Sequence, residues 1–278
     1  MTRCNQDNDL EDMELDALME TVWRRYGYDF RQYARPSLKR RVANIIRGEG
    51  LKTISELQDA VLHDAVSMEK LLCGVTVNVT SMFRDPTFFL TFRRKVIPYL
   101  ATYPFICIWI AGCSTGEEFY SIAIILEEEG LYDRCRIYAT DLNEAALHKA
   151  KEGIFDTTKM KEYTANYQKA GGERCFSDYY TAAYNSAVFN PSLTKNIVFA
   201  RHNLVTDASF NEFQVILCRN VIIYFNNTLR DRVHNLLYDS LVRFGFLGLG
   251  SNETIKFTQH EKDYEEIEKG EQLYRKIR

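Results

Sequence analysis

The sequence contains no run of about 18 uninterrupted apolar residues, so it lacks the pattern of a membrane-spanning helix. Its first residues, MTRCNQDNDLEDMELD, are polar and acidic and hold no apolar signal core. Both absences predict a cytoplasmic protein without direct membrane insertion. What the sequence does contain is the composition of a folded globular protein, because 46% of its 278 residues are hydrophobic and 26% are charged.

Cysteine and histidine are few and scattered. The seven cysteines are odd in number, irregularly spaced and never form a Cys-x-x-Cys pair, which argues against a disulfide framework and a structural zinc site. The five histidines do not cluster either. We therefore expect no bound metal ion and no catalysis by a Cys/His or Ser/His/Asp arrangement.

Charge is unevenly distributed, although the net charge is only −3. Residues 1–20 hold seven acidic side chains and one basic one, whereas residues 21–52 hold nine basic side chains and two acidic ones. Such an excess of positive charge can attract an acidic partner, but it also occurs on an ordinary solvated helix face. A pI near 6.0 and the lack of interleaved aromatic and basic residues argue against a nucleic-acid partner.

Two kinds of pattern divide the chain. Apolar residues at helical spacing predict helices over most of residues 9–80, with Leu15, Leu18 and Val22 on one face. We therefore expect an N-terminal helical domain over residues 1–80 and a linking segment over residues 81–103. From residue 104 to residue 278, short apolar runs alternate with helical patterns, which predicts an α/β domain with a doubly wound, mostly parallel sheet.

Within this second domain, the run FQVILCRNVIIYF (213–225) predicts a strand, and LRDRVHNLLYDSLVRFG predicts a helix that ends at Gly245. Residues 156–196 break the alternation, because they are polar and rich in tyrosine. This segment is too long for a plain connection. We expect it to be a small inserted unit that contains a few antiparallel strands.

The loop AGCSTGEE (111–118) follows the first predicted strand, where open parallel sheets bind ligands. Gly112 and Gly116 allow a sharp turn and a close approach to a ligand. Glu117 and Glu118 begin the next helix, and two carboxylates there would repel a pyrophosphate. The loop also lacks the Gly-x-Gly-x-x-Gly pattern, which argues against a nicotinamide-dependent oxidoreductase. A nucleoside-like ligand without pyrophosphate, such as S-adenosylmethionine, fits better.

Polar residues follow the later strands as well. Asp141 closes the second predicted strand, where a carboxylate can accept hydrogen bonds from both ribose hydroxyls or can cap the following helix. Asn203, Leu204 and Asn220 follow two further strands, so they belong to the same sheet edge. Each is a weak signal by itself, because Asn at a strand end is often only a turn residue.

Five segments together carry a resemblance that covers nearly the whole chain, from about residue 15 to the C-terminus. They are NVTSMFRD (78–85), AGCSTGEEFYSIAI (111–124), ATDLNEAALHKAKEGIF (140–155), VFARHNL (198–204) and ILCRNVIIYF (216–225). In this order they resemble the CheR family of chemotaxis-receptor glutamate O-methyltransferases, which depend on S-adenosylmethionine. The resemblance implies a Rossmann-like class I methyltransferase sheet and a product pair of glutamate methyl ester and S-adenosylhomocysteine.

The resemblance also implies roles for individual residues. Arg84 and Tyr224 match residues placed near the transferred methyl group. One of Glu117 and Glu118 matches a cofactor-binding glutamate, and we favour Glu118. The remaining positions that match cofactor contacts are Asn78, Thr80, Arg84, Asp141, Asn203, Leu204, Arg219 and Asn220.

Partners follow from the same resemblance. The basic N-terminal helices resemble the part of the family that faces the acidic methylation helices in the cytoplasmic domain of a receptor. Residues 156–196 resemble a β-subdomain that in some members docks a peptide from the receptor's C-terminus. We expect a monomer. A signalling scaffold or sensor that binds S-adenosylmethionine without transferring a methyl group stays open as an alternative.

Three features depart from the family's usual pattern. Phe119 stands where the family usually has proline, and Met82 replaces the first phenylalanine of a Phe-Phe-Arg segment. Because both replacements are apolar, we expect cofactor binding to be preserved. The third departure is the tyrosine-rich inserted segment, which puts its peptide-docking role in question.

Overall fold

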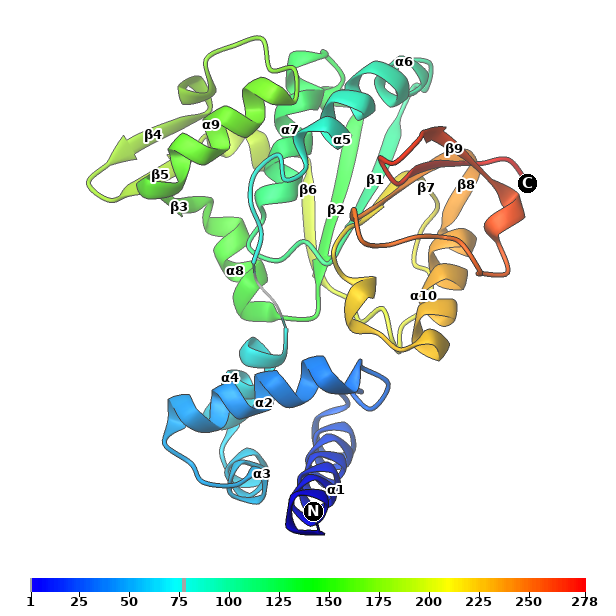
Figure 1. Ribbon diagram of the computed structural model, residues 1–278. Coiled ribbons are helices and arrows are strands. Elements are labelled where there is room, and N and C mark those ends of the chain that lie inside the picture. Colours follow the sequence, from blue (N-terminus) through cyan, green and yellow to red (C-terminus); the bar gives the residue numbers. More distant parts are fainter. Residues whose placement is uncertain (1, 77–78) are drawn as a thin grey trace. The chain divides into compact units, whose positions relative to one another are not determined.

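The computed structural model describes residues 2–76 and 79–278. The chain divides into two compact units (Figure 1). The helical unit contains Met1–Val77 together with Tyr224–Arg230, and the larger unit contains Asn78–Ile223 and Asp231–Arg278.

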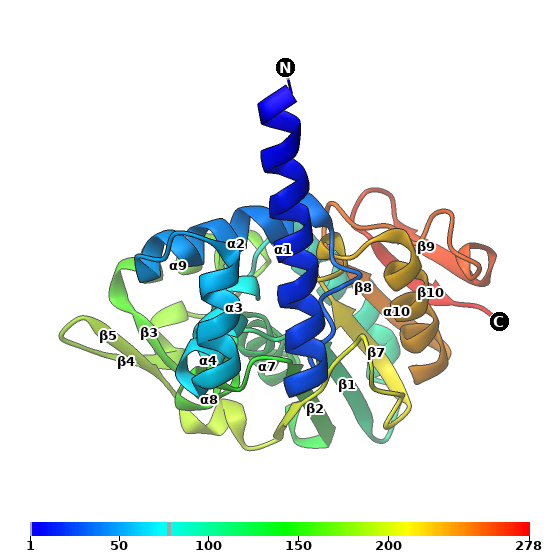
Figure 2. The same cartoon turned by 90° about the horizontal axis from the view of Figure 1, so that it is seen from below.

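The helical unit is built from amphipathic helices. They are α1 (Thr2–Tyr26), α2 (Arg35–Glu49), α3 (Ile54–His63) and α4 (Ala65–Val75). α1 packs beside α3, as Figure 2 shows. Leu15, Leu18 and Val22 are fully buried, which confirms the apolar face predicted for this helix. Within residues 2–76 and 79–278, no helix is both long enough and apolar enough to cross a membrane.

The larger unit contains a seven-stranded sheet. In spatial order its strands are β6 (Ile197–Arg201), β2 (Cys135–Asp141), β1 (Ile106–Ala111), β7 (Phe213–Cys218), β8 (Leu241–Leu249), β10 (Leu273–Lys276) and β9 (Tyr264–Glu268). The neighbours from β6 to β8 are parallel, and β10 runs antiparallel to β8 and β9. The predicted doubly wound, mostly parallel α/β sheet is therefore confirmed. The strand order reverses at β1, which has β2 on one side and β7 on the other.

Helices accompany the sheet. They are α5 (Pro86–Thr91), the π-helix η1 (Phe92–Val96), α6 (Ile97–Leu100), α7 (Glu117–Glu128), α8 (Glu144–Glu152), α9 (Met160–Lys169) and α10 (Asn227–Ser240). Short 3-10 turns are η2 (Tyr132–Arg134), η3 (Thr157–Lys159), η4 (Phe176–Tyr179), η5 (Pro191–Thr194), η6 (Ile222–Tyr224) and η7 (Glu261–Asp263).

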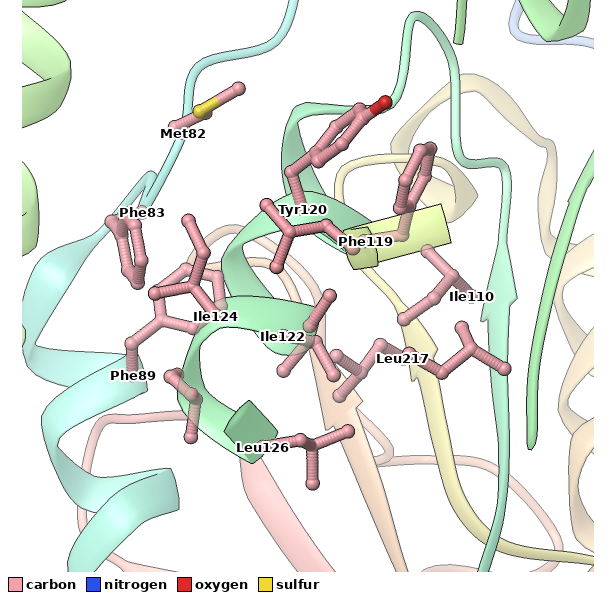
Figure 3. Close-up of a cluster of buried hydrophobic side chains, with 14 of the residues drawn as sticks. Met82, Phe83, Phe89, Ile110, Phe119, Tyr120, Ile122, Ile124, Leu126 and Leu217 are labelled. Atoms are coloured by element: carbon pink, nitrogen blue, oxygen red, sulfur yellow. The ribbon is translucent and has the colours of Figure 1, made fainter. Parts of the chain in front are cut away.

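The main core lies on one face of the sheet. Ile108 and Ile110 of β1 pack in the same apolar cluster as α7 and α5 (Figure 3). Trp109, which stands between them, contacts Phe213 instead, with ring centroids 5.3 Å apart. Successive strand residues point to opposite faces, so β1 is buried on both sides. That arrangement explains its continuous apolar sequence.

Two predicted element boundaries were wrong. β7 ends at Cys218, because Asn220 has a left-handed backbone (φ 61°) and the chain then enters η6. α10 ends at Ser240 rather than at Gly245, and Leu241 already pairs with Phe213 as the start of β8. Helical periodicity continues across this junction in the sequence, but pairing with β7 decides the conformation, since tertiary context overrides local propensity.

The inserted segment forms a second, antiparallel sheet with the order β3-β5-β4. Its strands are β3 (Ile154–Asp156), β5 (Ser186–Phe189) and β4 (Tyr180–Ala183). The small antiparallel sheet that we expected here is thus present, and α9 precedes β4 in the chain.

Buried tyrosines of this segment bind one carboxylate at the end of α7. The hydroxyls of Tyr167 and Tyr179 both donate to Glu128, the latter at 2.8 Å. Arg93 of η1 completes the cluster with an ion pair to Glu128. Burial and the hydrogen bond to Glu128 raise the pKa of Tyr167 to about 12. These contacts give a physical reason for tyrosine at two positions of the segment, because a phenylalanine at either would remove one of the donors to this carboxylate.

Replacement of Tyr179 by phenylalanine tests this anchoring. We expect Tyr179→Phe to lower the free energy of unfolding by about 1.5–3 kcal/mol, because a hydrogen bond to a charged group is lost. Tyr184→Phe is the matched control, since Tyr184 is fully exposed in the same segment, and it should change stability by less than about 0.5 kcal/mol. Urea unfolding of the full chain measures both, and equal effects would contradict the anchoring role.

Candidate functional site

The loop between β1 and α7 requires glycine at two positions. Gly112 has φ 81°, and a Cβ atom there would lie 2.5 Å from Val221 Cγ2. Gly116 has φ 103°, and a Cβ atom there would lie 2.6 Å from the ring of Phe119. A side chain at Gly112 would therefore push this loop away from the loop that follows β7, and a side chain at Gly116 would collide with the start of α7 and with Ala150 of α8. Gly112 lets the two loops meet where the strand order reverses.

Two residues that depart from the family's usual pattern belong to the core next to this loop. Met82 and Phe119 are both fully buried (Figure 3). The Phe119 ring lies 4.3 Å from that of Tyr120 and 5.2 Å from that of Phe199, measured between centroids. Both residues therefore act as packing residues beneath the loop.

Asp141 lies at the end of β2 and faces the same loop. Its Oδ2 accepts the backbone N–H of Ser114 at 2.8 Å, and its Oδ1 accepts that of Asn143 at 2.9 Å. Burial raises the pKa of the Asp141 carboxyl, and these backbone donors oppose the shift. A carboxylate offers about four acceptor positions, so Asp141 can accept further donors. Asn143 caps α8 with its own side chain, which leaves the helix-cap interpretation of Asp141 without support.

The two glutamates that begin α7 have different surroundings. Glu117 is fully buried, and its carboxylate accepts the hydroxyls of Thr115 at 2.6 Å and Tyr163 at 3.2 Å. Glu118 pairs instead with Arg219 at 2.9 Å through Oε2. Burial raises the pKa of Glu118, and the charge of Arg219 opposes the shift. Within residues 79–278, no hydrogen bond engages Oε1 of Glu118, so this oxygen can accept a ligand donor.

Arg219 joins three parts of the larger unit. Its buried guanidinium donates to Glu118, to Asp85 Oδ2 at 2.9 Å and to the carbonyl of Arg84 at 3.1 Å. It also lies 4.2 Å above the ring of Phe88. The backbone of Arg84 is thus fixed, while its half-buried side chain donates to the carbonyl of Val79 at 3.0 Å.

Asn203, Leu204 and Asn220 occupy the same edge of the sheet as Asp141. Asp141 pairs in register with Arg201, so Asn203 follows directly beyond the end of β6. Its Oδ1 accepts the backbone N–H of Val205 at 3.0 Å, and Leu204 is buried. The edge therefore presents one carboxylate, two amides and one apolar side chain.

Sequence reasoning missed Glu253. Its buried carboxylate accepts three backbone N–H groups, from Gly250 at 2.6 Å, Asn220 at 2.8 Å and Ile223 at 3.2 Å. A Cβ atom on Gly250 would lie 2.6 Å from the side-chain amide of Asn220. Glu253 thus fixes the backbone conformation of the loop after β7. Its only sequence signal is an acidic residue shortly after a strand and a glycine, which is too common to be informative.

The other predicted residues are not all part of this edge. Asn78 lies outside the described residues, and Thr80 is half-buried in the segment that follows it. Tyr224 falls in the helical unit, where its carbonyl accepts the N–H of Ala34 at 2.8 Å. Among residues 2–76 and 79–278, no group of three His, Cys, Asp or Glu side chains is arranged to hold a metal ion.

Comparison with known proteins gives matches over most of the chain. The family model "CheR methyltransferase, SAM binding domain" matches residues 78–272, and "CheR methyltransferase, all-alpha domain" matches residues 13–76. A Pseudomonas putida protein named "Putative methyltransferase Cher3" is 48% identical over 265 residues, which are 95% of this chain and 97% of that protein. A "Chemotaxis protein methyltransferase" of Listeria innocua is 31% identical over 88% of this chain and 92% of its own.

Removal of the Arg219 guanidinium should destabilise the fold in a pH-dependent way. We expect Arg219→Met to cost about 3–5 kcal/mol at pH 8, because the largely buried carboxylate of Glu118 loses its ion-pair partner. The loss should shrink at pH 5. The pKa of Glu118 is already raised, so protonation there removes the buried charge.

The measurement is urea unfolding of the variant and the wild type at both pH values. Arg136→Met removes an exposed arginine from β2 and should have little effect at either pH. A loss that is equally large at pH 5 and pH 8 would contradict the role given to the Glu118–Arg219 pair.

Proposed function

Because this chain belongs to the CheR methyltransferase family, we propose that it transfers a methyl group from S-adenosylmethionine to glutamate side chains of a chemotaxis receptor. The products are glutamate methyl esters and S-adenosylhomocysteine. The observation that carries the proposal is the edge where β1, β2 and β7 end. Asp141 binds the backbone of the loop at this edge. Arg219 binds both Glu118 and the backbone carbonyl of Arg84, and all of these residues belong to one unit.

The residues at this edge suit S-adenosylmethionine. Asp141 has acceptor capacity for the two ribose hydroxyls, and its neighbour Ser114 is already oriented by it. Glu118 would accept the ammonium group through its free oxygen, whereas the carboxylate of Glu117 is occupied by Thr115 and Tyr163. Two carboxylates at the start of α7 favour a cationic ligand over a phosphate.

Further contacts would come from the loops around these carboxylates. Asn203 and Asn220 offer amides to the adenine or amino-acid groups, and Leu204 offers an apolar surface for the adenine face. Arg219, with its N–H groups directed at protein acceptors, would act as a positioning residue that holds Glu118 and Arg84 in place.

Transfer to a carboxylate needs positioning rather than a general base. Glutamate has a reference pKa of about 4.3, so the nucleophile is already ionised at neutral pH. A carboxylate oxygen forms a bond to the methyl carbon as the bond to sulfur breaks, and opposite charges are neutralised. Arg84 would hold the carboxylate through two parallel N–H bonds. Precise positioning can contribute about 7–11 kcal/mol to lowering the barrier.

The distribution of charge in the helical unit is consistent with an acidic receptor surface. Asp12 of α1 pairs with Arg35 at 2.9 Å and with Lys39 at 2.8 Å, so part of the basic excess is neutralised internally. Arg40 and Arg47 of α2 are exposed. We propose that exposed basic residues of this unit face the methylation helices of the receptor, and that the sheet formed by β3, β5 and β4 offers the edge strand β4 to a receptor peptide.

Cofactor binding tests the role of Asp141. We expect Asp141→Asn to weaken the binding of S-adenosylhomocysteine by about 10–100-fold, since a hydrogen bond to a charged group contributes about 1.5–3 kcal/mol. Asp178→Asn, at an exposed position in η4, is the control and should bind like the wild type. Isothermal titration calorimetry measures all three proteins. Unchanged affinity in Asp141→Asn would remove this residue from the site.

Methyl transfer tests the function itself. Receptor-containing membranes incubated with the protein and radiolabelled S-adenosylmethionine should incorporate base-labile methyl esters. Arg84→Ala should lower turnover by about 100-fold or more and change S-adenosylhomocysteine affinity much less, while Arg94→Ala, at an exposed position in η1, should retain turnover. A wild-type protein that binds S-adenosylhomocysteine but labels no receptor would favour the scaffold alternative.

A further inference from the structure

The short segment that carries Arg84 has an unusual backbone. Phe83 and Asp85, which flank Arg84 in the larger unit, both have left-handed backbone conformations, with φ 52° and φ 57°. This region is unfavourable for residues with a Cβ atom, and a bulky aromatic residue rarely adopts it. Such conformations persist where the surrounding structure imposes them, and they are common at functional sites. Contacts from outside the segment therefore determine where Arg84 lies.

One peptide group of this segment is held at both of its polar atoms. The N–H of Phe83 donates to Oγ of Ser121 in α7 at 2.9 Å. The carbonyl of Met82 accepts Nδ2 of Asn166 in α9 at 3.2 Å. Both atoms belong to the same planar peptide group, so two helices of the larger unit fix the orientation of that plane. The chain passes from this plane directly through Phe83 to Arg84.

Ser121 can hold the segment because its hydroxyl makes two hydrogen bonds. The side chain is fully buried, and the hydroxyl donates to the carbonyl of Glu117 at 2.7 Å. With its proton used there, the oxygen accepts the N–H of Phe83. Ser240 makes only the first kind of bond. It is also fully buried in a helix and donates to the carbonyl of Leu236 at 2.7 Å, but within residues 79–278 its hydroxyl accepts no N–H from another segment.

The other side of Arg84 is held as well. Arg219 donates to the carbonyl of Arg84 at 3.1 Å and to Asp85 Oδ2 at 2.9 Å. Arg84 thus lies between two fixed points of the backbone. Burial raises the pKa of the Glu118 carboxyl, and the charge of Arg84 is among those that oppose the shift. The guanidinium of Arg84 is therefore directed toward the sheet edge that contains Glu118.

We propose that Ser121 and Asn166 are positioning residues that direct Arg84 at the acceptor carboxylate. The inference rests on the proposed function, in which Arg84 holds that carboxylate. Removal of the Ser121 hydroxyl frees the N–H of Phe83, so the peptide plane can rotate and Arg84 shifts with it. Cofactor binding should persist, because Asp141 is held by the loop after β1 and does not depend on this segment.

The test compares kcat on receptor membranes with S-adenosylhomocysteine affinity. We expect Ser121→Ala to lower kcat about 10–100-fold, the effect of a misplaced active-site group. Its cofactor affinity should stay within about twofold of the wild type, since only turnover uses Arg84. Ser240→Ala is the matched control, because it also removes a buried helical hydroxyl, and it should retain wild-type kcat. A wild-type kcat in Ser121→Ala, or an equal fall in kcat and cofactor affinity, would overturn the inference.

A double-mutant cycle shows whether Ser121 acts through the arginine. If it does, Ser121→Ala should cause little further loss of kcat in an Arg84→Ala background. An additional loss there as large as the loss in the wild-type background would contradict a positioning role.

A second variant covers the case in which Ser121→Ala fails to fold. Asn166→Ala removes the donor to the Met82 carbonyl from a half-buried position, and it should lower kcat while cofactor affinity persists. Gln168→Ala, at an exposed position of α9, is its control. Wild-type kcat in Asn166→Ala would then overturn the inference. Failure of the proposed function is distinguishable, because the wild-type protein would transfer no methyl group at all.

Discussion

The buried guanidinium of Arg219 is the constraint on which the candidate site depends. It comes from the loop after β7 and binds a carboxylate of α7, the side chain of Asp85 and the backbone of Arg84. Each of these partners is more than 100 residues from Arg219 in the sequence. Within residues 79–278, no other cation lies at hydrogen-bonding distance from Glu118. A buried ion pair of this kind contributes geometry more than stability. The same contacts hold Arg84, the residue proposed to bind the acceptor carboxylate.

α7 is anchored by buried carboxylates at both of its ends. Glu117 and Glu118 at its start connect to Tyr163 of α9 and to Arg219, and Glu128 at its end connects to Arg93 and to two tyrosines of the inserted segment. The inserted segment is therefore tied to the helix that follows the loop proposed to bind the cofactor. This arrangement lets a small antiparallel sheet extend from the core while its base stays fixed.

The two units correspond closely to the two stretches that match the CheR methyltransferase family, and each is held together by its own contacts. In the larger unit, Gly112 allows the loop after β1 to meet the residues after β7, and Met82 and Phe119 are buried in the core. In the helical unit, the segment that begins at Tyr224 is paired with the turn before α2.

The sequence by itself determined the class of fold, and it marked the edge of the sheet at which the site is proposed to lie. Alternating apolar runs specify the parallel sheet, and Gly112, Gly116 and Asp141 mark the strand ends, because these signals are local in the chain. Tertiary structure alone decided the rest. Pairing with β7 turned Leu241 onward into a strand despite its helical pattern, and burial gave Glu117 and Glu118 different partners although they are neighbours. The role of Glu253 depends on backbone groups of the loop after β7, which lie about 30 residues earlier in the chain and which no spacing in the sequence records.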